Sequence, residues 1–117
     1  MEHPYSQGED FCPAYHHAVE LIGRRWTGVI LRQLLLGSSR FAEIRDAIPA
    51  LTDRMLASRL RELEAESIVT RTVIDTIPVQ VQYELTDKGR DLERTITALS
   101  EWADHWEGDR GESPTAS

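Results

Sequence analysis

The chain has 117 residues, a formal net charge of −7 at pH 7 and one cysteine, Cys12. This length favours one domain with a modest hydrophobic core, and a single cysteine excludes an internal disulfide, which fits a reducing cytoplasm. The sequence has neither an apolar run long enough for a transmembrane helix nor the basic and apolar start of a secretion signal, so we expect a cytoplasmic protein without a membrane partner.

The acidic balance argues at first against a nucleic-acid binder, but the charge is unevenly spread along the sequence. Residues 24–61 contain eight arginines and three acidic residues, a local charge of +5, whereas the segments on either side are acidic. Charge alone fits a DNA-binding surface and an ordinary solvated surface equally well. The polar ends, residues 1–10 and 108–117, are predicted to be flexible tails around a domain of residues 11–107.

Two helices are predicted in the first third of the sequence. Residues 13–23 have Pro13 in the first turn and an apolar face at helical spacing. Residues 26–36 form a second helix that is apolar on nearly every side, which is typical of a buried, central helix. Gly28 within it weakens the helix by about 1 kcal/mol relative to alanine, so we expect another backbone to pack closely there.

The stretch over residues 41–61 predicts a helix-turn-helix. A third helix over residues 40–48 ends before Pro49, which cannot continue it, and Thr52 is a natural N-cap for a fourth helix. Two helices joined by so short a turn suit a DNA-binding unit whose second helix enters the major groove by its N-terminal end. Arginine offers guanine a bidentate fork, and serine or threonine contacts bases or phosphates. The outward face carries the predicted DNA contacts: Thr52, Arg54, Ala57, Ser58 and Arg61.

Each of these arginines has a second interpretation, as an exposed helix residue that pairs with a neighbouring glutamate. Arg59 lies nearer the buried flank of the helix, where a structural ion pair is as well supported as a DNA contact. Arg25 and Arg40 are predicted to contact phosphates. Arg71 and Gln80, which lie in a predicted β-hairpin over residues 68–85, are weaker candidates for DNA contacts.

Residues 68–74 and 80–85 alternate apolar and polar side chains and predict two strands, joined by a loop with Pro78 at its tip. A helix-turn-helix followed by a β-hairpin is the winged-helix plan, so the predicted fold is mainly α with a small β-hairpin wing. Thr86 caps a final helix that reaches about residue 106.

The final helix carries an apolar stripe with two tryptophans, which a domain of this size has little left to cover. We therefore predict a homodimer built from the first and last helices. Packing of the stripe onto the second helix of the same chain is the alternative. The predicted interface consists of Tyr15, Val19, Ile22, Leu92, Ile96, Leu99, Trp102, Ala103 and Trp106.

Five motifs follow one another along the chain: CP at residues 12–13, IGRRW at 22–26, SRFAEIRDAIP at 39–49, LASRLRELE at 56–64 and VQYELTDKGRDL at 81–92. With these motifs the chain resembles the HxlR family of bacterial transcriptional regulators, relatives of the MarR-type winged helices. The resemblance implies a homodimer that binds an inverted repeat in promoter DNA with two recognition helices and two wings. Ala50 and Ser67 stand where the family often has glycine, and Gln80 and Gln82 where it often has arginine and glutamate, so the wing carries little positive charge.

Some regulators of this family sense oxidants or electrophiles through a cysteine at the CP position, so the resemblance gives Cys12 a role in redox sensing. A position near a helix N-terminus favours the reactive thiolate, and His16 and His17 lie one turn on. The alternative for Cys12 is a small residue packed at the dimer seam. His16 and Glu20 stand four residues apart, but a solvated helix surface is the better interpretation, and we predict no metal site and no cofactor.

No arrangement of carboxylates, serine and histidine, or phosphate-binding glycines indicates catalysis, so we do not expect an enzyme. The predicted function is sequence-specific transcriptional regulation on double-stranded DNA. Two rivals stay open: a winged helix that binds another protein, and a small-molecule binding protein that uses Trp26, Trp102 and Trp106. A small-molecule effector of the regulator is also compatible with the sequence.

Overall fold

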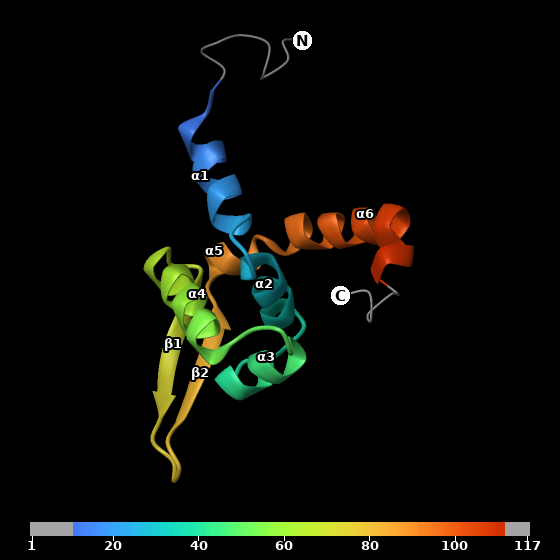
Figure 1. Ribbon diagram of the computed structural model, residues 1–117. Coiled ribbons are helices and arrows are strands. Elements are labelled where there is room, and N and C mark those ends of the chain that lie inside the picture. Colours follow the sequence, from blue (N-terminus) through green and yellow to red (C-terminus); the bar gives the residue numbers. More distant parts are fainter. Residues whose placement is uncertain (1–10, 112–117) are drawn as a thin grey trace.

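In the computed structural model, which describes residues 11–111, helices and a β-hairpin surround one apolar core (Figure 1). The elements follow in the order α1 (Pro13–Ile22), α2 (Thr27–Leu35), α3 (Phe41–Ala47), α4 (Asp53–Ala65), β1 (Val69–Ile74), β2 (Gln80–Leu85), α5 (Asp87–Arg90) and α6 (Glu93–Gly111). A helix-turn-helix followed by an antiparallel hairpin confirms the predicted winged-helix fold.

Helix α2 lies at the centre of the core and contacts α1, α3, β2 and α6. Its residues Ile30, Leu31 and Leu34 are buried. The prediction that this helix is apolar and buried on nearly every side is wrong for one face, because Val29 and Leu36 are 45% and 65% exposed. The described residues therefore leave part of the central helix uncovered.

The hairpin has an inner face that packs on the body and an outer face that meets solvent. Strand β1 pairs with β2 so that Val69 lies opposite Leu85 and Arg71 opposite Tyr83. Because successive side chains of a strand point to opposite faces, these residues share one face. Val69, Tyr83 and Leu85 are buried there against the core, which fixes the orientation of the hairpin.

A second link joins the hairpin to the start of α3. Arg40 forms an isolated β-bridge with Gln82, and the backbone N–H of Tyr83 donates a hydrogen bond to the carbonyl oxygen of Ser39 (2.7 Å). The segment before α3 thus extends the sheet by one bridge. This link ties the wing to the first helix of the helix-turn-helix.

Close backbone packing occurs at Gly89 instead of at the predicted Gly28. A Cβ atom added to Gly28 would lie 3.9 Å from the carbonyl oxygen of Ile22, an ordinary contact, so that prediction is wrong. A Cβ atom on Gly89 would collide with the carbonyl oxygen of Ile68 and come within 2.9 Å of Leu85 Cδ2. Glycine is therefore required where α5 crosses the start of β1.

The final helix is broken, whereas the sequence predicted one continuous helix from Thr86. Thr86 is the N-cap of α5 as predicted, since its Oγ1 accepts a hydrogen bond from Gly89 N–H (3.0 Å). Helix α5 ends at Arg90, and the chain turns before Glu93, where Leu92 N–H bonds to the carbonyl oxygen of Gly89 (3.0 Å). The close packing of Gly89 fixes α5 on the sheet, and the turn lets α6 leave in another direction.

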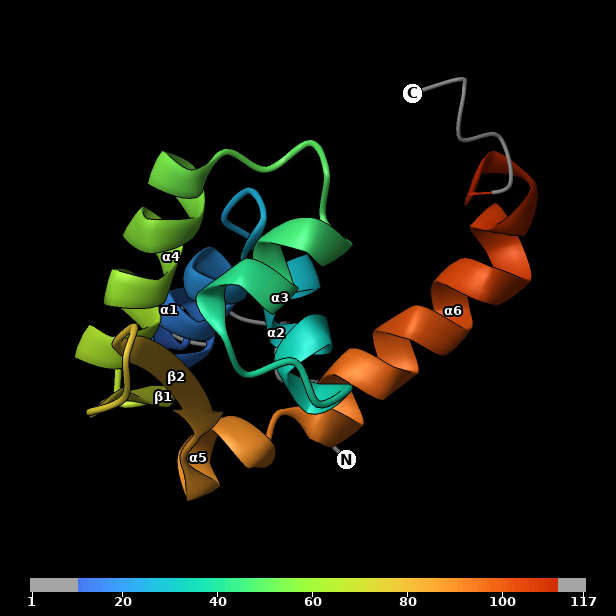
Figure 2. The ribbon, with the colours of Figure 1, turned by 90° about the horizontal axis from the view of Figure 1, so that it is seen from below.

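Helix α6 runs away from the rest of the molecule as a separate arm (Figure 2). It continues to Gly111, past the predicted helix end at about residue 106. The predicted tail over residues 1–10 and the end of the other tail lie outside the described residues. Among the helices of the described part, none is long and apolar enough to cross a membrane.

Two non-glycine residues in the described range adopt a left-handed backbone conformation, Trp26 (φ 79°) and Ser67 (φ 62°). Ser67 stands at the junction between α4 and β1, where the family often has glycine. Ala50 also stands where the family often has glycine, but its backbone does not adopt the left-handed conformation.

Candidate nucleic-acid interface

The helix-turn-helix consists of α3 and α4, joined by residues 48–52. Ile48 and Leu51 are buried and anchor this connection in the core. Thr52 is the N-cap of α4 as predicted, because its Oγ1 accepts a hydrogen bond from Met55 N–H (3.1 Å). The N-terminal end of α4 is thereby fixed and turned to solvent.

Helix α4 has a buried leucine face and an exposed arginine face, as predicted. Leu56, Leu60 and Leu63 are buried in the core. Arg54 and Arg61 are exposed, and neither takes part in an ion pair among the described residues. Both guanidinium groups are therefore available to an external anion or base.

The remaining predicted residues of α4 flank this exposed face. Thr52 is exposed, and Ala57 and Ser58 are half-buried. In the first turn, Asp53 is balanced by Arg45 of α3, whose Nη1 lies 3.5 Å from the Asp53 carboxylate. This pair reduces the repulsion that Asp53 would exert on a phosphate.

Arg59 has the structural role that the sequence left open. The residue is 9% exposed, its Nε donates to the carbonyl oxygen of Arg25 (2.8 Å), and its Nη1 lies 3.0 Å from Glu62. Arg24 reaches the same carboxylate at 3.2 Å. Arg59 therefore holds the α1–α2 connection on α4 and is not presented to a ligand.

The predicted phosphate contacts lie on two other parts of the surface. Arg25 is exposed, with its guanidinium 5.1 Å from the ring centre of Trp26. Arg40 lies beside the wing, on a shallow hollow of about 320 Å³ that Gln80 and Val81 also line. Arg40 and Gln80 thus line the same hollow. Arg25 does not line it and lies on the connection between α1 and α2.

The carboxylate of Glu43 contributes to the backbone structure beside Arg40. Its Oε1 accepts hydrogen bonds from the backbone N–H groups of Arg40 (3.0 Å) and Ser39 (2.9 Å). These two donors hold the pKa of Glu43 below its ordinary value, with Arg40 the larger cause. The charged glutamate caps α3 and fixes the backbone that carries Arg40.

The acidic C-terminal end of α4 is partly neutralised. Glu62 pairs with Arg59 and Arg24, and Glu66 lies 3.0 Å from His17 Nε2. The hydrogen bond with His17 lowers the pKa of Glu66. Two of the glutamates are therefore paired, whereas Arg54 and Arg61 present positive charge without an ion-pair partner among the described residues.

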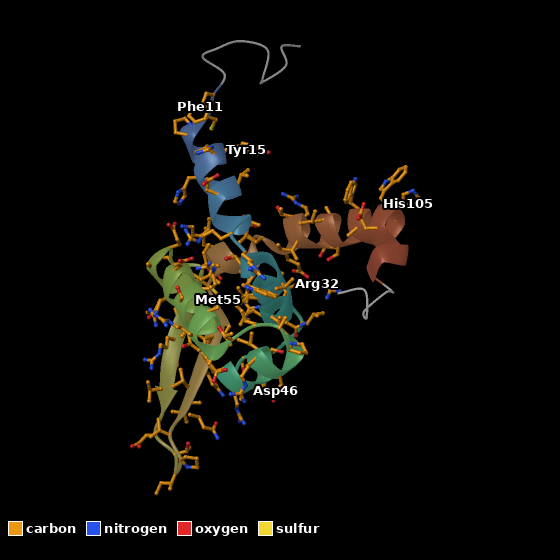
Figure 3. The ribbon with its side chains drawn as sticks, viewed as in Figure 1. Phe11, Tyr15, Arg32, Asp46, Met55 and His105 are labelled. Carbon is orange, nitrogen blue, oxygen red and sulfur yellow. The ribbon has the colours of Figure 1, made fainter. Side chains whose placement is uncertain are left out.

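Cys12 is exposed and is the N-cap of α1, where its Sγ accepts a hydrogen bond from Tyr15 N–H (3.4 Å). Of the two histidines expected nearby, His17 pairs with Glu66 and His16 lies with its ring 5.4 Å from that of Phe11. Figure 3 shows Phe11 and Tyr15 at the end of α1 that is distant from the core. Among the described residues, no cluster of three or more metal-ligating side chains is found.

The predicted dimer stripe of α6 divides into a buried and an exposed part. Ile96 was predicted to lie in the dimer interface, but it is only 5% exposed and belongs to the chain's own core. Leu92 also packs against that core. A hydrogen bond from Arg32 Nε to Ser100 Oγ (3.1 Å) holds this part of α6 on α2. The alternative of packing onto α2 therefore applies to the first turns of α6.

The rest of the predicted dimer interface, on α1 and α6, remains at the surface of the described structure. Most of its apolar residues are about half exposed or more, and Ile22 and Ala103 are half-buried. The exposed members are Tyr15 (56%), Val19 (47%), Leu99 (55%), Trp102 (55%) and Trp106 (66%).

The apolar end of the wing is an exposed surface that is not among the predicted sites. Ile77 and Val79 were assigned only to a loop, but they are 102% and 59% exposed at the tip of a projecting hairpin. Two branched apolar residues on either side of Pro78 in an otherwise polar loop were the signal that could have identified them.

Comparisons with known proteins agree with this architecture. Residues 21–110 match the HxlR-like helix-turn-helix family. The uncharacterized HTH-type transcriptional regulator YvaP of Bacillus subtilis is 45% identical over 97 residues, which cover 83% of this chain and 90% of YvaP. The HTH-type transcriptional regulator YodB of the same organism is 42% identical over 99 residues, covering 85% of this chain and 88% of YodB.

Solved structures show the same fold. The reduced form of YodB from B. subtilis has a TM-score of 0.72 at 43% identity and covers 82% of this chain and 94% of its own. YodB is also known in diamide-treated and quinone-bound forms. The redox regulator HypR in its oxidized form has a TM-score of 0.74 at 39% identity, with 80% of this chain and 96% of HypR covered.

The relatives are named as transcriptional regulators and not as enzymes, as the sequence predicted. The family match spans most of the chain, and the helix-turn-helix and wing are present in the structure. The chain belongs to the HxlR-like helix-turn-helix family of transcriptional regulators.

Proposed function

We propose that this regulator acts in the cytoplasm as a homodimer on an inverted-repeat operator in promoter DNA, with α4 in the major groove. The observation that carries the proposal is the exposed face of α4, where Arg54 and Arg61 have no ion-pair partner among the described residues. Arginines in this position, on a helix whose N-terminal end is capped and exposed, match the geometry of base reading.

The residues divide into base contacts and backbone contacts. Arg54 and Arg61 read bases, and Thr52, Ala57 and Ser58 border them. Arg25 and Arg40 neutralise phosphates, which position the protein without specifying sequence. From the wing, Arg71 and Gln80 add contacts beside Arg40.

The dimer forms through α1 and α6. Helix α1 has no buried residue in the chain itself, and Leu99, Trp102 and Trp106 of α6 are each more than half exposed. Apolar surface of this extent normally belongs to a contact with another molecule. A two-fold dimer places its two recognition helices about 34–36 Å apart, one helical turn of DNA, so the half-sites should have this spacing.

Footprinting of the purified protein on DNA upstream of its own gene tests the proposal. We expect protection of two half-sites in inverted orientation, at the spacing of one helical turn or a multiple of it. A Trp102→Glu/Trp106→Glu variant should become monomeric and lose the footprint, since both half-sites must be occupied together. A folded dimer that holds no duplex even at low ionic strength would exclude the proposed function.

We also propose that oxidants or electrophiles regulate DNA binding through Cys12. The thiol is exposed at the N-cap of α1, and two related regulators, YodB and HypR, have been studied in chemically modified or oxidized forms. Two Cys12 thiols, one from each subunit, give up two protons and two electrons to an oxidant such as diamide and form a disulfide; a quinone forms an adduct with one thiol.

Operator binding before and after diamide tests this regulation. We expect the affinity for the operator to change on oxidation in the wild type, to return after reduction, and to stay constant in Cys12→Ser. An oxidant response that persists in Cys12→Ser would assign the sensing to another group. Equal operator binding by the untreated wild type and Cys12→Ser is the control for intact folding.

A further inference from the structure

Three charged side chains connect α3 with the N-terminal end of α4. Arg45, in the last turn of α3, lies with its Nε 3.3 Å from Asp46 Oδ1 and with its Nη1 3.5 Å from Asp53 Oδ2. The side chain of Asp53 is 61% exposed and that of Arg45 is 41% exposed. The guanidinium group is therefore held between two carboxylates, one from each helix of the helix-turn-helix, and Asp53 remains open to a ligand.

The backbone that carries Asp53 is fixed on both sides. Asp53 is the first residue of α4, directly after the N-cap Thr52, and Leu51 before the cap is buried in the core. The carbonyl oxygen of Thr52 accepts the first helical hydrogen bond, from Leu56 N–H (2.9 Å). In the carboxylate, Oδ2 faces Arg45, whereas Oδ1 accepts no hydrogen bond among the described residues. One acceptor oxygen is thus free at a fixed position.

A carboxylate at this place is not explained by the helix alone. The helix dipole favours an acidic residue in the first turn, and Asp87 of α5 follows its N-cap Thr86 in the same way. Asp87 has no ion-pair partner among the described residues, so the pair across to another helix is particular to Asp53. Without that pair, a carboxylate beside Arg54 would repel the phosphates of a bound duplex.

The base edges in a major groove determine what this carboxylate can contact. An ionised carboxylate only accepts hydrogen bonds. Cytosine presents the N4 amino donor, whereas guanine and thymine present acceptors and adenine has the acceptor N7 beside its amino group. Residues at the N-terminal end of a recognition helix are those that contact base edges. An aspartate there, with one oxygen free, therefore favours cytosine.

We propose that Asp53 is a specificity-determining residue that accepts a hydrogen bond from the N4 amino group of a cytosine in each half-site. Arg45 is a positioning residue: it holds Oδ2, leaves Oδ1 to the base and offsets the negative charge near the phosphates. The cytosine lies beside the base pairs that Arg54 and Arg61 read. This inference depends on the proposed function, because α4 must enter the major groove first.

Selection of bound duplexes from a library with a random central segment, followed by sequencing, tests the inference with the full chain. The wild type should enrich a motif that has cytosine at one position of each half-site. In Asp53→Ala the preference for cytosine at that position should fall at least about fivefold, and the rest of the motif should stay. Asp53→Asn should move the preference from cytosine to adenine, because an amide both donates and accepts.

Two further positions separate a base contact from a structural role. Arg45→Ala should weaken the cytosine preference, and Arg45→Lys, which keeps the positive charge, should restore part of it. Asp87→Asn removes the corresponding first-turn carboxylate of α5 and, as the matched control, should leave the motif unchanged. A partly unfolded variant binds all duplexes less, so a folding defect does not alter the motif.

The possible results distinguish the inference from the function on which it depends. An unchanged motif in Asp53→Ala would overturn the inference, as would an Asp53→Asn variant that binds every duplex more tightly with the wild-type motif. Asp53 would then be a first-turn residue that stabilises the helix and repels phosphates. An unchanged motif in Arg45→Ala would overturn the positioning role. A wild type that enriches no sequence would overturn the proposed function itself.

Discussion

Arg59 and Arg61 lie on one turn of α4, and replacing either by alanine removes one positive charge. We expect the two changes to affect different properties, because Arg61 is exposed and Arg59 is buried. Arg61 is exposed and forms no ion pair among the described residues, so Arg61→Ala should change the free energy of unfolding by less than about 0.5 kcal/mol. Its loss should appear in DNA binding, at about 1–3 kcal/mol, which corresponds to roughly 5- to 160-fold in Kd.

Arg59→Ala should instead destabilise the fold. Arg59 is 9% exposed and donates to the Arg25 carbonyl oxygen at 2.8 Å and to Glu62 at 3.0 Å. Truncation removes a charge-assisted hydrogen bond and leaves a carbonyl oxygen without its donor, which together cost about 2–4 kcal/mol. The variant should still bind the operator at temperatures where it is folded.

Urea unfolding and anisotropy titrations on operator and scrambled duplexes separate the two effects. Arg94→Ala on α6 removes one positive charge far along the chain from α4 and is the charge-matched control. The reasoning would be refuted if Arg61→Ala lost stability as Arg59→Ala does. If Arg61→Ala weakened binding equally on operator and scrambled DNA, Arg61 would be a phosphate contact and not a base reader.

Three further changes test other parts of the structure. Arg40→Ala should weaken binding to all duplexes similarly and lower the salt slope by about one, because a phosphate contact is lost; an unchanged slope in salt titrations would contradict this. Ser67→Gly should raise the free energy of unfolding by about 0.5–1 kcal/mol in urea, because glycine adopts φ 62° without the cost that serine bears there, and a loss of stability would show that the serine is preferred. The pKa of Glu43 is lowered from 4.5 in the folded chain, so its contribution to stability is complete above about pH 4.5 and is lost as the pH falls through the lower folded value; Glu43→Gln should therefore flatten the pH dependence of thermal unfolding in this acid range, and an unaltered profile would remove Glu43 from the account.

The parts of this fold that depend on local sequence were predictable. Helical spacing of Leu56, Leu60 and Leu63 identified the buried face of α4, and the same spacing identified Arg54 and Arg61 as exposed. Pro49 and Thr52 marked the turn, because proline ends a helix and threonine caps the next one.

Features that depend on contacts between distant segments were not predictable. The break before α6 follows from the approach of Gly89 to the backbone of Ile68, which no periodicity in residues 86–106 indicates. Ile96 belongs to the apolar stripe by spacing, but its burial depends on where α6 crosses α2. The exposure of Ile77 likewise depends on how far the hairpin projects beyond the body.

Helix α1 and the residues just after it contact α4 through two side chains, His17 in the middle of α1 and Arg24 beyond its C-terminal end. His17 pairs with Glu66 and Arg24 with Glu62, while Cys12 caps the opposite end of α1, a helix about 15 Å long. The Cys12 thiol is thus connected to α4 through α1, the Arg24–Glu62 ion pair and the His17–Glu66 hydrogen bond. A displacement of α1 by the reaction proposed for Cys12 would therefore act directly on Glu62 and Glu66 at the C-terminal end of α4.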